Sequence, residues 1–194
     1  MALQIAVIWE EPILFTRLFE DCGHCCELVT PHLLAAPFFR RRLNGLVIPA
    51  GFASSGHTRI LAALRAISPR IKRYLQEGGT VLAFGAGADL PRAYDWLPIQ
   101  ISYQYGFTQA PLIGSPSSPF ASIIEEGAGE VSIDGVLDIN QDESNGQVIL
   151  QTPKGPVMVS ITYGSGRILI ASLHEYPHPR FVREFCAGGG EGLL

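Results

Sequence analysis

The chain has 194 residues, of which 47% are apolar and 16% charged, so it is long enough for one domain with a large buried core. Its net charge of −4 gives no electrostatic support for nucleic-acid binding, and we interpret the basic cluster at residues 40–42 as a solvated helix end. No apolar run approaches the roughly 20 residues of a membrane span, and the N-terminus lacks the pattern of a signal peptide. We therefore expect a cytoplasmic protein that binds neither nucleic acid nor membranes.

Strand and helix patterns alternate over the first 90 residues. Apolar runs predict strands at residues 3–9, 43–49 and 80–84, and residues 25–30 are a further short strand candidate. Apolar residues at helical spacing predict helices at residues 13–19, 58–67 and 68–77, with a short helix or irregular crossover at 31–42. Ser68 is the predicted N-cap of the last helix, and Gly78 follows its predicted end. Because strands that alternate with helices are joined by right-handed crossovers, this order predicts a parallel, doubly wound sheet.

The second half of the chain is richer in predicted β-structure. Short alternating runs predict strands at residues 129–139, 147–151 and 156–163, with a hairpin turn at 153–156. A further buried strand is predicted at 167–172 and a short helix at 180–186. No repeat or linker divides the chain, so we expect one domain over residues 1–187, followed by a flexible, glycine-rich tail at 188–194.

Small-residue loops follow the strands predicted at residues 43–49 and 80–84. The second loop begins with a tight turn, Gly85-Ala86-Gly87, of the strand-to-helix kind that carries a nucleophile in many α/β enzymes. Ligands on parallel sheets bind at the carboxyl ends of the strands, where both loops lie. The predicted ligand-binding residues are Ala50, Gly51, Phe52, Ser54, Ala86 and Gly87.

Three stretches of the chain together resemble the class I glutamine amidotransferase family, particularly the glutaminase part of phosphoribosylformylglycinamidine synthase. Residues 46–53 are similar to the family's strand and oxyanion loop, residues 79–87 to its strand and nucleophile elbow, and residues 163–180 to its closing histidine region. A similar layout is found in the amidotransferase-like domain associated with biotin–protein ligases. The resemblance implies a flavodoxin-like α/β fold, in which helices flank a mostly parallel central sheet with extra antiparallel strands.

The chain departs from this family at the catalytic residues. The family pattern places a nucleophilic cysteine in the middle of the elbow, and the resemblance aligns Gly85 with it. Either His174 or His178 matches the family's histidine, but Tyr176 and Arg180 stand where its glutamate is expected. Glu175 is the remaining candidate for the acidic partner. Because loss of the nucleophile removes most of the rate of a catalytic triad, we expect no glutaminase activity.

Other reactive side chains have simpler interpretations. Cys22, His24, Cys25 and Cys26 resemble a metal cluster, but no second ligand pair follows, and neighbouring residues of a strand point to opposite faces. We interpret them as structural cysteines, and Cys186 as part of the last helix. Ser54 and Ser55 cap their loop, contact a ligand or act as nucleophiles, and we favour the first of these roles. Asp89 either caps the next segment or faces the pocket. We interpret His57 as a solvated helix end.

These observations predict a catalytically impaired, amidotransferase-like protein that acts as a small-molecule-binding or interaction module. The alternative is a hydrolase, or an amidotransferase of another type. It would use His174 or His178 as general base, with backbone N–H groups of Gly51 and residues 85–87 as an oxyanion site. We expect no cofactor and no metal. The candidate partners are a small molecule, a second copy of the chain, and a synthetase or ligase that the chain would serve as a subunit.

Overall fold

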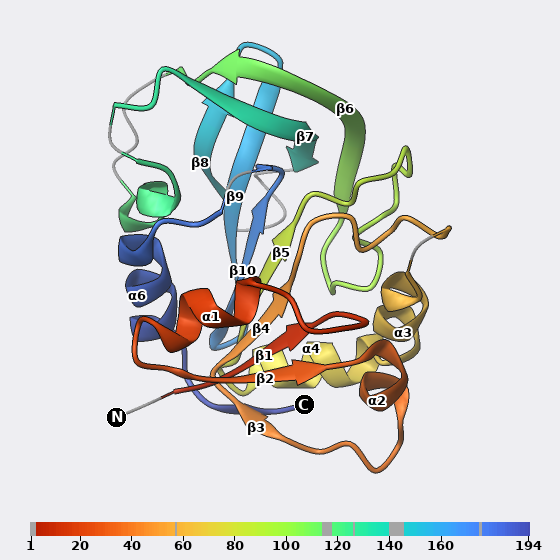
Figure 1. Cartoon of the computed structure of the whole chain (residues 1–194). Helices are drawn as coiled ribbons and strands as arrows, with labels where there is room; N and C mark the ends of the chain where they lie inside the picture. The colour runs from red at the N-terminus through yellow and green to blue at the C-terminus, as the bar shows by residue number, and fades with distance from the viewer. Residues whose placement is uncertain (1–2, 57, 114–117, 126, 140–145, 175) are drawn as a thin grey trace.

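The computed structural model describes residues 3–56, 58–113, 118–125, 127–139, 146–174 and 176–194. Its main element is a seven-stranded sheet with the strand order β2-β1-β4-β5-β10-β9-β8 (Figure 1). The strands are β1 (Gln4–Ile8), β2 (Cys25–Val29), β4 (Gly45–Ile48), β5 (Thr80–Phe84), β8 (Gly146–Thr152), β9 (Gly155–Tyr163) and β10 (Gly166–Ala171). The first five strands of the order run parallel, and β9 and β8 extend the sheet as antiparallel strands. The predicted mostly parallel α/β sheet is confirmed.

Helices cover both faces of this sheet (Figure 1). Helices α1 (Phe15–Glu20) and α6 (Pro179–Ala187) pack on one face with a 3₁₀ helix, η1 (Pro119–Ile123), beside α6. Helices α3 (Ile60–Ala66) and α4 (Ser68–Gln76) pack on the other face, and α2 (Pro31–Ala35) contacts α3. The predicted cap of α4 differs, because Ile67 is the N-cap residue and Ser68 Oγ donates instead to Trp96 O, at 2.8 Å. No helix among the described residues is long and apolar enough to cross a membrane.

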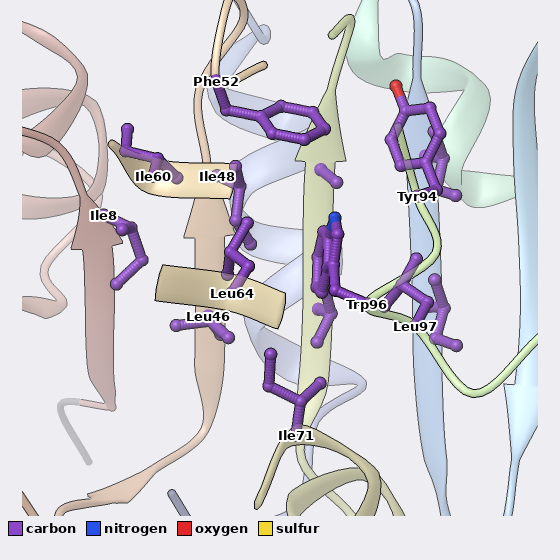
Figure 2. Packing of buried hydrophobic residues seen from close by; sticks show 14 of the residues in the cluster. Ile8, Leu46, Ile48, Phe52, Ile60, Leu64, Ile71, Tyr94, Trp96 and Leu97 are labelled. Atoms are coloured by element: carbon purple, nitrogen blue, oxygen red, sulfur yellow. The ribbon is translucent and has the colours of Figure 1, made fainter. Parts of the chain in front are cut away.

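The core on the α3 side explains why the apolar runs form these elements. Ile8, Leu46 and Ile48 project from the parallel strands toward Ile60 and Leu64 of α3 (Figure 2). All five side chains have no exposed surface. Burying an aliphatic side chain of this size stabilises a fold by about 1.5–3 kcal/mol, so this layer fixes the sheet that carries the site.

A two-stranded antiparallel sheet, β6 (Ile101–Pro111) with β7 (Glu130–Ile139), lies beyond one end of the main sheet (Figure 1). The sequence pattern does not predict β6, because Gly106 and Pro111 interrupt it and its middle residues are exposed. Its pairing with β7 shifts register between Tyr105 and Thr108, an irregularity that lets a glycine-containing strand bend. This second sheet carries side chains to the candidate site.

The C-terminal residues pack at the opposite end of the main sheet. Strand β11 (Gly192–Leu193) pairs with β3 (Arg42–Leu43), a short strand that separates from β4 within the run predicted as one strand at residues 43–49. Leu194 is only 2% exposed, and its backbone exchanges two hydrogen bonds with Arg41. The expected flexible tail at 188–194 is therefore corrected, because the glycines bring an apolar terminal residue into the core.

Candidate functional site

The turn after β5 is held by backbone hydrogen bonds from the loop that follows β4. Gly51 N donates to Gly85 O at 2.8 Å, and Ala53 N donates to Ala86 O at 3.0 Å. A Cβ atom on residue 87, where φ is +68°, would lie 2.6 Å from Gly51 Cα, so conformation and space both require glycine there. The Gly51 N–H, which we predicted as an oxyanion donor, is therefore already hydrogen-bonded to the carbonyl oxygen of Gly85.

Tyr103 of β6 lies near the turn after β5. Burial raises the pKa of Tyr103, and backbone hydrogen bonds from Gly87 and Ala86 act against this rise. The Tyr103 hydroxyl donates to Asp134 O at 3.0 Å. Tyr103 therefore links β6 to Asp134 of β7 beside this turn.

The carboxylate of Asp134, on β7, fills the space beside Gly85. A Cβ atom on residue 85 would overlap Asp134 Oδ2 and would lie 2.6 Å from Asp134 Cβ. Real Cβ atoms essentially never approach other atoms within 3.0 Å, so the turn accommodates no side chain at residue 85 without a shift of Asp134. The space that a side chain on residue 85 would need is thus occupied by a carboxylate from another strand.

The chain segment after β10 holds Asp134 in place. Asp134 N donates to Ser172 O at 2.8 Å, and His174 N donates to Ser132 O at 2.9 Å, so this segment pairs with β7 as a short antiparallel extension. Ser172, which is fully buried, also donates from Oγ to Gly135 O at 2.6 Å. This pairing sets Asp134 opposite His174.

Asp134 and His174 form a hydrogen-bonded pair between a buried and an exposed group. His174 Nδ1 lies 3.1 Å from Asp134 Oδ1, and the His174 and Asp134 side chains are 56% and 6% exposed, respectively. Burial raises the pKa of the Asp134 carboxyl above its ordinary value, and the His174 imidazole opposes this rise. When Asp134 is ionised it accepts from Nδ1–H, which leaves Nε2 of a neutral His174 as a free proton acceptor.

A pocket of about 310 Å³ opens beside His174. Its walls come from the carboxyl ends of β1, β4, β5 and β10 and from α1, and they are mainly apolar. The lining residues are Trp9, Ile13, Phe15, Pro49, Ala50, Phe84, Leu173, His174 and Tyr176. An aromatic pocket with one basic group suits a small, largely apolar molecule that carries one polar group.

Solved structures share this arrangement of sheet and helices. A protein from Thermoplasma acidophilum that is assigned to GMP synthase, as one of its subunits, is 14% identical, with a TM-score of 0.59 over 96% of this chain and 94% of that one. A glutamine amidotransferase from Thermotoga maritima is 11% identical, with a TM-score of 0.56 over 90% of this chain and 76% of that one. The chain has a class I glutamine amidotransferase-like fold.

This amidotransferase-like fold also matches part of a larger protein. The β-galactosidase from Rahnella sp. R3 is 11% identical, with a TM-score of 0.55, and the match covers 97% of this chain but 30% of that one. Comparison with protein-family models gives no match, and neither does comparison with curated proteins. The chain thus shares a backbone architecture with these structures at a level of identity that establishes the fold alone.

The structure brings some of the predicted site residues of this amidotransferase-like fold together and separates others. Ala50 and His174 line the same pocket. His178 instead caps α6, where its Nδ1 accepts from Arg180 N at 3.2 Å. Phe52 is fully buried in edge-to-face contact with Tyr94 and Trp96, because a large apolar ring is more stable in the core than at the loop surface. Glu175 and His57 lie outside the described residues.

The remaining predicted residues lie at the edges of the site or away from it. Ser55 lines a different pocket, near Glu10 and α3, and Asp89 is exposed. Ala86 is buried and its carbonyl is bonded to Ala53, so its side chain supports the turn. Ser54 N donates to Gly51 O at 3.1 Å, which holds the loop closed.

The cysteines lie apart from the pocket. Burial raises the pKa of both Cys26 and Cys186 to about 12, which keeps these thiols protonated and poorly nucleophilic. Cys25 is exposed and Cys22 is partly exposed, and all four thiols are free. In the part of the chain that the structure describes, no group of three or more histidine, cysteine and acidic side chains is placed to hold a metal ion.

Asp134 is the residue that sequence reasoning missed. It stands inside the strand VSIDGVLDI, where aspartate is uncommon because its side chain competes with the backbone for hydrogen bonds. That position was a signal, but the partner of Asp134 is far away in the chain and could not be found from local pattern. Trp9 was also not predicted as a site residue, although it lies directly after β1 and lines the pocket.

Proposed function

We propose that this chain is a non-catalytic amidotransferase-like module, which binds a small molecule in the pocket beside His174 and does not hydrolyse glutamine. One observation carries the proposal: the Asp134 carboxylate fills the space of a side chain at Gly85. The resemblance aligns Gly85 with the family's nucleophile. A chain that lacks this nucleophile, and that also places another side chain in its volume, has lost the group that attacks the amide.

The groups around the turn support the same conclusion. The Gly51 N–H donates to Gly85 O, and the Tyr103 hydroxyl near the turn donates to Asp134 O. Stabilisation of an oxyanion requires donors that are aimed at the developing charge and free to bind it. Because the Gly51 N–H is already bonded, the site lacks one of the donors predicted for an oxyanion, while the aromatic pocket next to it stays open.

The experiment that tests this function is a measurement of ammonia release from glutamine by the wild-type chain. We expect no release above the rate of a heat-inactivated sample. A Gly85→Cys variant should also be inactive, because Asp134 obstructs the new side chain. Substantial ammonia release by the wild type would overturn the proposal.

Ligand binding has a built-in reporter. The chain has two tryptophans, of which Trp9 lines the pocket and Trp96 has no exposed surface. In a screen of small aromatic and heteroaromatic compounds, a pocket ligand should change the fluorescence of the wild type. The same compound should leave the fluorescence of a Trp9→Phe variant unchanged, because the remaining tryptophan is in the core.

The Asp134–His174 pair supports a second candidate function, a hydrolase of another type. An imidazole whose Nδ1 is held by a carboxylate can use Nε2 to take a proton from water or a substrate. This candidate predicts activity against a panel of ester and amide substrates that is lost in His174→Ala and kept in His178→Ala. An inactive wild type leaves only the binding function.

A protein partner is a further part of this proposal. One structural neighbour is assigned to GMP synthase as one of its subunits, and exposed apolar side chains of this chain, Leu14, Phe107 and Tyr176, lie on segments that reach the pocket. Co-purification of the tagged chain from its own cells with a synthetase or ligase would support such a partner. A cytoplasmic location remains the prediction made from the sequence.

A further inference from the structure

A second pocket, of about 490 Å³, lies on the side of the sheet covered by α6 and η1. It shares no lining residue with the pocket beside His174. We call it the polar pocket, after the side chains of Ser118, Gln147, Ser160, Thr162, Arg167 and Glu184 that line it. Its volume falls within the range of about 300–1,000 Å³ that is typical of small-molecule sites.

The register of the sheet places a polar row beneath this pocket. Thr162 of β9 pairs with Arg167 of β10, and Ser160 of β9 pairs with Gln147 of β8. Cross-strand partners share a face of the sheet, as do residues two apart on one strand, so these four side chains point the same way.

The polar row departs from the rest of its face. Further along β10, Leu169 and Ala171 lie on the same face as Arg167 and are buried in the core with α6. Hydrophobic packing under α6 accounts for Leu169 and Ala171, and exposure to solvent accounts for the polar Thr162 and Gln147 at the outer end of the row. Arg167 and Ser160 are half-buried, and they form the inner end of the row.

Arg167 is held in position by an aromatic ring and not by an ion pair. Its Cζ atom lies 5.0 Å from the centre of the Phe120 ring, which is itself 8% exposed. The ring covers a face of the guanidinium, and the N–H donors of a guanidinium lie in its plane, so they remain available at its edge. Within the described part of the chain, the Arg167 side chain makes no hydrogen bond or ion pair.

Glu184 of α6 brings the opposite charge to the same pocket. Its carboxylate lies beyond ion-pair distance of Arg167 and is bonded to no side chain among the described residues. A simple anion would be attracted by the Arg167 guanidinium but repelled by the Glu184 carboxylate. A simple cation would be attracted by Glu184 but repelled by Arg167. A ligand with both charges satisfies both groups.

We propose that the polar pocket binds a small zwitterion of the amino-acid type. The ligand's carboxylate accepts hydrogen bonds from the edge of Arg167, and its ammonium group donates to Glu184. The hydroxyl groups of Ser160 and Thr162 and the amide of Gln147 bind the remaining polar atoms. This site is independent of the pocket beside His174, so either proposal can fail without the other.

The test is an NMR titration of the full chain that follows the Nε–Hε signals of the arginine side chains. The probes are L-alanine, which carries both charges, acetate, methylamine and inorganic phosphate. We expect L-alanine to bind more tightly than the other three and to shift the Arg167 signal. Equal binding of acetate or phosphate, or no binding of L-alanine, would overturn the proposal.

Variants of Arg167 and Glu184 test whether these two charged side chains bind L-alanine. Arg167→Ala should weaken L-alanine binding about tenfold or more, since hydrogen bonds to charged groups are worth about 1.5–3 kcal/mol. Arg167→Lys keeps the charge and the side-chain stem, and should bind with intermediate affinity. Glu184→Gln should lower the affinity for L-alanine to that for acetate. Arg183→Ala, on the exposed side of α6, is the matched control and should bind as the wild type does.

Unchanged L-alanine binding in both Arg167→Ala and Glu184→Gln would place the ligand elsewhere and overturn the proposal. The thermal unfolding curve of each variant shows whether it is folded. If Arg167→Ala does not fold, the comparison of Arg167→Lys with Glu184→Gln decides the same question.

Discussion

The Asp134 side chain occupies the space that a Cβ atom on Gly85 would need, although 49 positions of sequence separate residue 134 from residue 85. Substituting Gly85 by alanine should therefore lower the free energy of unfolding by about 1–3 kcal/mol, the range for overpacking of a filled core. Urea unfolding measures the change. Gly56→Ala is the control, because a Cβ atom at residue 56 meets no atom within 4 Å. Equal stability of the two variants would contradict the contact.

A double-mutant cycle tests whether Asp134 causes that cost. In an Asp134→Gly background both the carboxylate and the Cβ atom of residue 134 are absent, so Gly85→Ala should cost much less than it does in the wild type. The difference between the two costs is the coupling free energy of the pair, and pairs in direct contact typically show about 0.5–3 kcal/mol. Additive effects would mean that another group restricts residue 85.

The raised pKa of Asp134 predicts how stability changes with pH. A carboxyl whose pKa rises on folding binds its proton more tightly in the folded state. Its stabilising contribution is complete below the unfolded-state pKa of about 3.9, and is lost as pH rises through the folded-state pKa. Asp134→Asn resembles the protonated form and still accepts a hydrogen bond from His174. It should therefore gain stability relative to the wild type as pH rises from about 4 to 7.

Urea unfolding at a series of pH values measures this difference. Asp138→Asn is the matched control, because Asp138 lies on the same strand and is exposed. Its stability relative to the wild type should change little with pH. Tyr94, Tyr103 and His174 are the titratable groups that interact with Asp134. Because His174 lowers the pKa of Asp134 and burial raises it, the trend should persist or grow in His174→Ala, and a trend that disappears there would contradict burial as its cause.

The two candidate histidines should respond differently to substitution. His178→Ala removes the cap of α6 and should cost about 0.5–1 kcal/mol of stability, with little effect on binding in the pocket. His174→Ala removes an exposed ring and should weaken the binding of any ligand found by Trp9 fluorescence, with a smaller effect on stability. The two variants are compared by thermal unfolding and by titration. The opposite pattern would place the site at His178.

The C-terminal leucine should contribute as a core residue does. Leu194 is 2% exposed, so Leu194→Ala should lower the free energy of unfolding by about 2–5 kcal/mol, as large-to-small core substitutions do. Leu193→Ala is the control, because Leu193 is only partly buried. Urea unfolding measures the free energy of unfolding of both variants. If Leu194→Ala is as stable as the wild type, the last residues form a flexible tail, as the sequence predicted.

Local sequence pattern predicted the elements whose burial is continuous. Residues 80–84 are a strand in the structure with the predicted bounds, because an unbroken apolar run between glycines has one stable environment, the middle of a sheet. Strand β6 was missed because Tyr103 and Ile101 are buried while the residues between and after them are mostly exposed. Its conformation depends on pairing with β7, which local pattern does not contain.

The position of the candidate site could be predicted from the sequence, but the polar side chains that form it could not. The loops after β4 and β5 meet at the carboxyl edge because parallel strands impose that geometry. Asp134 reaches the same edge through the register between β7 and the segment after β10, a relation between residues about 40 apart in sequence. The packing of Leu194 depends in the same way on β3, so neither could be found from neighbouring residues.

The contact between Asp134 and residue 85 also constrains how the protein can change by single substitutions. A path that installs a reactive side chain at residue 85 must begin at Asp134, because the reverse order passes through a chain with two groups in one volume. That first step in turn removes the partner of His174. A sequence of single substitutions that places a nucleophile at residue 85 would therefore pass through an intermediate that has neither the Asp134–His174 pair nor the nucleophile.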